Sequence, residues 1–314
     1  MLIFFKQTIL EQLRTELHCH NEFSNFHVGK LDAPYDCNIT IQEQIEKSYQ
    51  LGLDSLFVTN HNTLDGYQEL LNYKNDHEKF KNIQIYPAEE ISTNDGSHII
   101  AYGISEPIKA GLSFEEILDE IKKQDAISSA PHPFSLLDAL RDKAQKCDLI
   151  EVFNSNNVDV LANTKATIFA QEHKITGVAG SDSHVLSTLG RCVNVIESEN
   201  NLDSIISAMK HKQISIQQTG YATAKETIDH LRYKIDNSTE FIYDYMAQFY
   251  PKSKKIFSLL LELFQRNPNS YLWILFYKFA IFAMKRISRK INFQDYDPFP
   301  MKDRNIGSML KMAF

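Results

Sequence analysis

The sequence predicts an α/β protein, with seven strands in a parallel sheet or a TIM-like (β/α)7 barrel and a C-terminal α-helical extension. In the first two-thirds of the 314 residues, short apolar or β-branched runs alternate with segments of helical periodicity, which is the pattern of βα units. After Gly220 the periodicity becomes purely helical, and glycine is absent from 221 to 306. We therefore predict a barrel domain over residues 1–220 and a helical extension over residues 221–314.

Seven segments have the composition and length of strands. They are residues 13–18, 55–59, 83–86, 98–102, 126–130, 149–153 and 177–180. Helices are expected between them, and two of these begin with the capping-box pattern, Thr40 with Glu43 and Ser113 with Glu116. Two further helices are predicted over residues 159–173 and 202–211.

Composition limits the class of protein. With 43% hydrophobic residues, the chain can bury a full core. Its cysteines are far apart and form no CxxC pair, which favours reduced thiols in a cytoplasmic protein over a disulfide framework. The apolar start lacks a basic leader and a cleavage site, so we expect no signal peptide. The formal charge of -7 argues against a surface that binds nucleic acid as a whole, although a local basic patch is compatible with it.

The extension contains one strongly apolar run, residues 271–284, which Lys278 interrupts. A run of about 14 residues is shorter than the roughly 20 that span a bilayer, so no transmembrane segment is predicted. We expect a helix that packs on the barrel or forms a homo-oligomer interface, with an interfacial membrane helix as the alternative. The basic run 285–290 is interpreted as a solvated face, or as a contact with a phosphate-rich partner.

Potential metal ligands occur where predicted strands meet loops. His18 and His20 close the first strand, where alternate side chains share one face. The others are His61 after the second strand, Glu90 after the third, His98 at the start of the fourth, His132 after the fifth, and Asp182 with His184 after the seventh. Because the strand ends of a (β/α) barrel converge on one face, we expect these side chains to form one metal site.

All of these residues except His98 lie in five ordered motifs. They are Glu-Leu-His-Cys-His20, Val-Thr-Asn-His61, Glu-Glu-Ile-Ser92, Pro-His-Pro133 and Gly-Ser-Asp-Ser-His184. In order and spacing they resemble the motifs of the polymerase and histidinol phosphatase (PHP) family, over about residues 13–219. The resemblance implies a distorted seven-stranded barrel, a di- or trinuclear site of zinc, manganese or iron, and hydrolysis of phosphoesters.

The resemblance also implies ligand sets. The first metal would be held by His18, His20, Glu90 and Asp182, a second by Glu90, His98 and His132, and a third by His61 and His184. The third centre of this family also takes an Asp or His shortly after the first two histidines. His27 is the candidate for that position, and Asn25 occupies the nearby polar position, so the choice between two and three metals stays open.

Mixed His, Asp and Glu ligands suit zinc, manganese or iron, and the sequence does not choose among them. Two such metals can hold a bridging hydroxide, which is the expected nucleophile. Asp182 or His184 could also pass a proton to the leaving oxygen. Arg191 is a candidate for substrate binding, because its guanidinium could donate two hydrogen bonds to a phosphate. A salt bridge at the barrel rim is an equal alternative. For Lys30 the alternatives are the same: a contact with a phosphate or a salt bridge at the rim.

Two polar residues that end the sixth predicted strand, Glu151 and Asn154, are expected to orient ligands or water. The function that we predict is metal-dependent hydrolysis of a small phosphomonoester, a nucleotide or an oligonucleotide end. One alternative is an amidohydrolase-like enzyme that cleaves amides or lactones. The other is a non-catalytic, metal-stabilised barrel whose extension recruits a partner.

Overall fold

The computed structural model describes residues 11–302 and 306–313. The apolar start, for which we predicted no signal peptide, lies largely outside these residues. Among the described residues, nine strands form one sheet in the order β7-β6-β5-β4-β3-β2-β1-β8-β9. The strands are β1 Glu11–Cys19, β2 Ser55–Val58, β3 Gln84–Ser92, β4 His98–Tyr102, β5 Ile127–Ala130, β6 Leu149–Asn154, β7 Thr176–Gly180, β8 Val193–Ser198 and β9 Ile214–Gln218.

The predicted number of strands was wrong, because the described part of the chain has nine strands rather than seven. The seven predicted segments are all strands, and β8 and β9 are additional. Strand β8 pairs antiparallel with both β1 and β9. The prediction recognised strands by their alternation with helices. Only a loop and a short 3-10 turn separate β7 from β8, so β8 does not fit that pattern. Strand β9 is mostly exposed, so it lacks the apolar signal of a buried strand.

Strand β4 runs antiparallel to both of its neighbours, β3 and β5. A uniformly parallel barrel would place the first residue of β4 at the opposite end from the other predicted ligands. The reversed direction instead pairs His98 with Ser92, at the end of β3. The start of β4 therefore lies at the same end of the sheet as the carboxyl ends of its parallel strands.

The sheet curls until its edge strand β7 meets β1. The backbone N–H of Asp182 donates to the carbonyl of His18 (2.8 Å), and that of His20 donates to the carbonyl of Ser183 (3.2 Å). An isolated parallel bridge joins Cys19 and Ser183. The result is a nearly closed, barrel-shaped sheet whose closing contacts lie beside the first two histidines.

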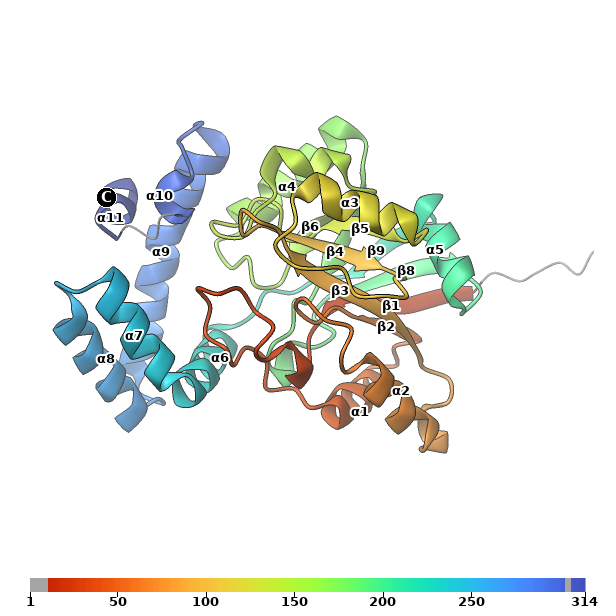
Figure 1. The fold of residues 1–314 in the computed structure, drawn as a ribbon, viewed down its shortest axis with the longest axis horizontal. Helices are drawn as coiled ribbons and strands as arrows, with labels where there is room; N and C mark the ends of the chain where they lie inside the picture. Colours follow the sequence, from red (N-terminus) through yellow and green to blue (C-terminus); the bar gives the residue numbers. More distant parts are fainter. Residues whose placement is uncertain (1–10, 303–305, 314) are drawn as a thin grey trace, which may run out of the picture.

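Helices surround this sheet (Figure 1). They are α1 Ile41–Gln50, α2 Tyr67–Asn75, α3 Phe114–Lys123, α4 Leu161–His173, α5 Leu202–Lys210, α6 Ala224–Asn237, α7 Thr239–Phe249, α8 Lys254–Arg266, α9 Tyr271–Phe293, α10 Phe299–Lys302 and α11 Ile306–Ala313. Both predicted capping boxes are confirmed: Thr40 and Glu43 begin α1, and Ser113 and Glu116 begin α3.

Apolar side chains fill the end of the barrel opposite to His98. Leu13 from β1, Tyr102 from β4 and Leu149 from β6 are buried there together with Ile205 and Met209 of α5. Helix α5 therefore closes this end, and the opposite end is left for polar side chains.

Helices α6 to α11 gather on one side of the barrel (Figure 1). One cluster joins Ile235, Met246 and Leu261 of α6, α7 and α8, and another joins Ile287 of α9 to Leu136 of the barrel. The domain boundary near residue 220 stays a prediction, because the extension contacts barrel residues directly. Among the described residues, no helix combines the length and the apolar character needed to cross a membrane.

Candidate metal centre

The carboxylate of Glu90 in β3 lies at the centre of the polar end of the barrel. Its Oε2 atom lies 3.3 Å from Nε2 of both His18 and His20. Its Oε1 atom lies 3.0 Å from Nδ1 of His98 and from Nε2 of His132. Nδ1 of His61 also lies 3.3 Å from Oε2, so Oε1 faces two histidines and Oε2 faces three others. The carboxylate therefore lies between two groups of imidazoles and has the arrangement of a group that can bridge cations.

Asp182 lies next to His18 and His20, the two histidines that face Oε2 of Glu90 from β1 and the residue after it. Its Oδ1 atom lies 3.5 Å from Nε2 of His18 and from Nε2 of His20. Burial alone would raise the pKa of this carboxyl, but the neighbouring histidines hold it well below its usual range. The pKa of Glu90 is also well below its usual range, because His61, His18 and His98 outweigh the effect of burial. Both carboxylates are therefore ionised, as metal ligands must be.

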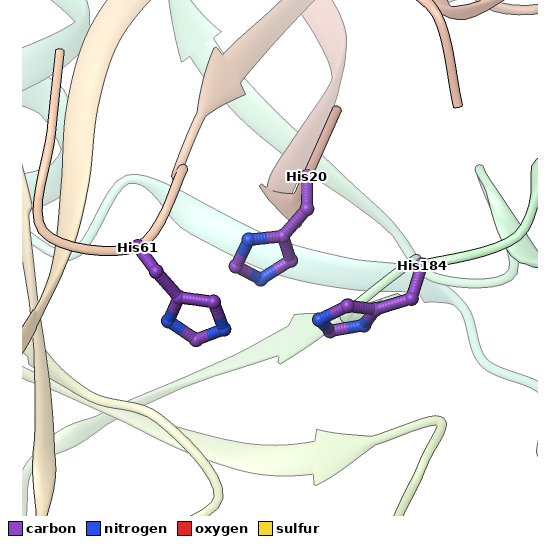
Figure 2. Close-up of side chains that lie close together, drawn as sticks. All are labelled: His20, His61 and His184. Atoms are coloured by element: carbon purple, nitrogen blue, oxygen red, sulfur yellow. The ribbon is translucent and has the colours of Figure 1, made fainter. Parts of the chain in front are cut away.

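A third group consists of His20, His61 and His184, whose rings turn toward one another from three separate loops (Figure 2). The ring centroid of His20 lies 4.6 Å from that of His61 and 4.4 Å from that of His184. The carboxylate beside them belongs to Asp36, which the sequence search did not single out. Its Oδ2 atom lies 2.8 Å from Nε2 of His184 and 3.4 Å from Nε2 of His61.

The two residues proposed for the third centre, His27 and Asn25, have other positions. His27 belongs to none of the three potential ligand groups found among the described residues, and its carbonyl accepts a hydrogen bond from Asn62. The side-chain oxygen of Asn25 accepts hydrogen bonds from the backbone N–H groups of Asp36 (2.7 Å) and Cys37 (3.0 Å). Asn25 thus holds the loop that presents Asp36.

Several buried polar atoms of this site lack a hydrogen-bond partner among the described residues. They are Nε2 of His20, Nδ1 of His61 and Oδ2 of Asp36. Each lies 2.8–3.5 Å from an imidazole or carboxylate of the site, but not in the geometry of a hydrogen bond. An unsatisfied buried polar atom is costly, and a cation held between these atoms would satisfy them. Burial, together with His184 and His61, lowers the pKa of His20. The neighbouring carboxylates outweigh burial and raise the pKa of His18, His98, His132 and His184, so metal ions would displace protons from these rings on binding. The residues present therefore fit divalent metal ions.

Glu151 in β6 orients two of the histidines. Its Oε1 atom accepts a hydrogen bond from Nδ1 of His18 (2.9 Å), which leaves Nε2 of that ring facing Glu90. Its Oε2 atom accepts from the backbone N–H of His132 (2.8 Å) and from the side-chain amide of Asn154 (2.8 Å). These contacts agree with the orienting role that we predicted for Glu151 and Asn154.

The backbone adopts uncommon conformations next to these contacts. His132 and Asp182 have positive φ values of 30° and 48°, which are uncommon for residues with a side chain. A Cβ atom on Gly180 would lie 1.7 Å from Oε1 of Glu151 and 2.7 Å from Cβ of His18. Only glycine at this position allows Glu151 to reach His18.

The groups face a cavity of about 180 Å³. It is lined by Val28, Gly29, Asp32, Asp36, His61, Glu90, His98, His132, Asp138, Asp182, His184, His230 and Lys234. The last two residues come from α6, within the predicted extension. Of the described residues that line the cavity, Lys234 is the one lysine or arginine.

Helix α6 contacts the third group directly. Nζ of Lys234 lies 2.6 Å from Oδ1 of Asp36, and Nε2 of His230 lies 2.7 Å from the carbonyl oxygen of Asp36. The His230 ring also stacks on His184, with a centroid separation of 4.8 Å. Burial lowers the pKa of His230 to about 3, so its ring is neutral. Asp36 outweighs burial and raises the pKa of Lys234, so this side chain stays a cation.

Arg191 has a different environment from the one expected for a phosphate contact. Its guanidinium forms an ion pair with Glu226 in the first turn of α6, which is the alternative we had left open. Glu226 also forms the capping box of α6 with Thr223. Arg191 is not among the residues that line the cavity, and Lys30 is exposed. Arg191 therefore links the loop after β7 to the helix that covers the site.

A nearly closed α/β barrel with imidazoles and carboxylates at one end defines a class of metal-centred barrel proteins. Comparisons identify the family more closely. A family model described as PHP-associated matches residues 160–214. The uncharacterized protein MJ1587 of Methanocaldococcus jannaschii is 32% identical over 158 residues, which are 49% of this chain and 89% of that protein.

Two further proteins are similar to this chain. The uncharacterized protein MJ0417 of the same organism is 27% identical over 172 residues, 51% of this chain and 66% of that protein. The crystal structure of PsfC from Pseudomonas syringae has a TM-score of 0.50 at 17% sequence identity, and the match covers 72% of this chain and 99% of that chain. At this identity the PsfC match shows a common fold. The chain belongs to the PHP domain family.

Proposed function

We propose that this protein is a metal-dependent hydrolase of phosphate esters, and that its substrate is a small phosphomonoester. The observation that carries the proposal is the position of Glu90, whose Oε1 faces two histidines and whose Oε2 faces three others, at 3.0–3.3 Å. A carboxylate between two sets of imidazoles is the arrangement that two-metal hydrolases need.

The proposed ligand sets follow the contacts described above. The first consists of His18, His20, Glu90 and Asp182, the second of Glu90, His98 and His132, and the third of His61, His184 and Asp36. Asp36 takes the place that we had given to His27. When bound, zinc, manganese or iron ions would supply an activated water and positive charge at the phosphate oxygens.

The residues around the metals have separate tasks. Glu151 keeps His18 in the tautomer that ligates through Nε2, since the Nδ1–H donates to Glu151. Lys234 supplies a cation from α6 that can bind a phosphate oxygen, and Arg191 positions that helix through Glu226. Asp182 and His184 line the cavity as well. Of the two, we retain His184 as the group that can pass a proton to the leaving oxygen, because Asp182 is ionised.

The size of the cavity supports a small substrate. Its volume of about 180 Å³ is below the roughly 300–1,000 Å³ of sites that enclose drug-sized ligands. Helix α6 lies over the third group through His230 and Lys234. A terminal phosphate can enter such a space, whereas the rest of a larger substrate would have to remain outside it.

Steady-state kinetics can test the proposal. The protein is stripped of metal, reloaded with manganese, zinc or iron in turn, and assayed with an aryl phosphate, a nucleoside monophosphate and an aryl phosphodiester. We expect saturable turnover of the monoesters and competitive inhibition by inorganic phosphate. Replacing Glu90 by Gln should abolish turnover and lower the bound metal, whereas the exposed His211→Ala variant serves as the matched control.

Three results would contradict the proposal. One is the absence of turnover of any phosphoester above the level of a His18→Ala, His20→Ala double variant. Turnover of an amide or a lactone without turnover of phosphates would favour an amidohydrolase-like function. A full complement of metal without any hydrolysis would favour a structural role for the barrel.

A further inference from the structure

Helices α8 and α9 expose large hydrophobic side chains along one side of each helix. We call this set the apolar stripe. Its members are Ile256, Leu259 and Leu263 on α8, and Tyr271, Leu272, Leu275, Phe276, Phe279 and Phe282 on α9, each between 43% and 64% exposed. Single exposed hydrophobic residues are common on proteins, but a series at helical spacing marks an interaction surface.

Apart from Phe276, whose ring stacks on Trp273 at a centroid separation of 5.7 Å, the apolar stripe is distinct from the side chains that hold the helices together. Leu261 and Phe264 of α8 turn inward and pack with Ile235 and Met246. Trp273 of α9 packs against Phe264, with a ring centroid separation of 5.1 Å. The helices therefore have an internal apolar core in addition to the exposed stripe. Together with α7, helix α8 lies at the end of the molecule farthest from the strands (Figure 1).

The same two helices carry most of the positive charge of the extension. Residues 252–290 contain nine lysines or arginines and one acidic residue, Glu262, which gives a formal charge of +8 in a chain whose total is -7. The exposed basic residues are Lys252, Lys255, Arg266, Lys278, Lys285, Arg286 and Arg289. The metal-centre cavity differs in charge from these helices, because the carboxylates of Asp32, Asp36 and Asp138 line it.

We propose that α8 and α9 bind the surface of a membrane that contains anionic phospholipids. Apolar and aromatic side chains on one face, with lysine and arginine around them, are the composition of helices that lie in the interface of a bilayer. Basic residues near such a surface are attracted to its negative potential. The absence of a membrane-crossing helix among the described residues is consistent with binding to the surface.

Two other occupants fit the same surface less well. A second copy of the chain would bring a segment of charge +8 against an identical one, which opposes association. A single nucleic-acid strand would match the positive charge and could stack on Phe276 or Phe282. It would leave Ile256, Leu259 and Leu263 without an apolar partner.

Helix α9 is firmly joined to the barrel. The amide nitrogen of Asn292 donates to the carbonyl of Phe134 (3.0 Å), and its oxygen accepts from Arg141 (3.0 Å). Ile287 and Ile291 are buried against Leu136. Binding of α9 to a membrane would therefore bring the barrel with it.

Vesicle sedimentation with the full-length protein tests this proposal. Vesicles of phosphatidylcholine alone are compared with vesicles of phosphatidylcholine and phosphatidylglycerol, each at low and high salt. We expect binding to the mixed vesicles, little binding to phosphatidylcholine alone, and a loss of binding at high salt. A Leu259→Ser, Leu275→Ser variant and a Lys285→Glu, Arg286→Glu variant should each partition at least about tenfold less well.

Matched controls lie on the barrel. Ile216→Ser changes an exposed hydrophobic residue of β9, and Lys122→Glu reverses an exposed charge of α3; both should bind as the unaltered chain does. Circular dichroism shows which variants fold, and the salt dependence of the unaltered chain provides a measurement that needs no variant. Equal binding to the two kinds of vesicle, or to neither, would overturn the proposal. So would a dimer or an oligonucleotide complex that forms through these helices while the vesicles remain unbound.

Discussion

The ammonium group of Lys234 lies 2.6 Å from the carboxylate of Asp36, although 198 positions separate the two residues in the chain. The same carboxylate faces His184 and His61 with its other oxygen. Asp36 thus connects the proposed third metal position to helix α6, and the predictions that follow begin with this pair.

Replacing Asp36 by Asn should reduce the bound metal by about one equivalent, because a neutral amide is a weaker ligand than a carboxylate. The residual metal should support slower hydrolysis. Elemental analysis after dialysis against a weak chelator measures the first effect, and steady-state kinetics measures the second. The comparison variant is His27→Ala, which should retain its metal. If metal were lost from His27→Ala and not from Asp36→Asn, the ligand of the third metal would be His27 rather than Asp36.

Replacing Lys234 by Met should raise KM for a phosphomonoester about 10- to 100-fold, which is the loss expected for one hydrogen bond to a charged group. Inhibition by inorganic phosphate should weaken by a similar factor, and Lys234→Arg should restore part of it. The matched control is Lys225→Met, on the same helix, where the side chain pairs with Asp229 at the surface. An unchanged phosphate inhibition constant in Lys234→Met would show that this lysine does not contact the phosphate.

Replacing Gly180 by Ala should destabilise the fold by roughly 1–3 kcal/mol, as overpacking of a buried site does. The added Cβ would lie 1.7 Å from Oε1 of Glu151, so this carboxylate would have to leave His18. Metal affinity should fall about 10- to 100-fold as the orientation of His18 is lost. Urea denaturation and metal titration measure these effects. Gly220→Ala is the control, because its Cβ would meet Cδ of Arg191 at an ordinary 3.6 Å.

Glu89 makes stability depend on pH. Burial raises its pKa from 4.5 to about 7, although the backbone N–H of Ile108 donates to it. The folded state therefore binds the proton more tightly than the unfolded state, and this contribution is complete below pH 4.5 and is lost as the pH rises through about 7. Its size is on the order of a few kcal/mol.

The Glu89→Gln variant should lack this contribution. Urea denaturation at several pH values should show that the free energy of unfolding falls more steeply from pH 4.5 to pH 7 in the unaltered chain than in the variant. The exposed Glu172→Gln variant should follow the unaltered chain. Identical slopes in all three proteins would mean that Glu89 is ionised in the folded state across this range.

Much of the candidate site could be predicted because its ligands end strands. The pairs His18 with His20 and Asp182 with His184 have the two-residue spacing of side chains that share a face, and this spacing can be read without a structure. His98 was singled out because it opens the fourth predicted strand, although a parallel barrel would not place a ligand at that end of a strand. It reaches the site because β4 runs antiparallel to β3, and the sequence had suggested a parallel sheet.

Asp36, His230 and Lys234 could not be found in this way. Asp36 lies in an irregular loop, where no periodicity assigns a direction to a side chain. Its orientation depends on hydrogen bonds from its backbone and that of Cys37 to Asn25. His230 and Lys234 lie on a helix whose sequence reads as an ordinary amphipathic surface helix. Only the packing of α6 against the barrel brings them to the cavity.

The contacts of α6 have a consequence for how the protein is made. During synthesis the barrel leaves the ribosome before α6 does, and domains fold from the N-terminus onward. A nascent barrel would then hold its histidines and carboxylates without the lysine that neutralises Asp36 and without the ring that covers His184. In the finished molecule an ion between Asp36 and His184 would be covered by a helix that is synthesised after the barrel.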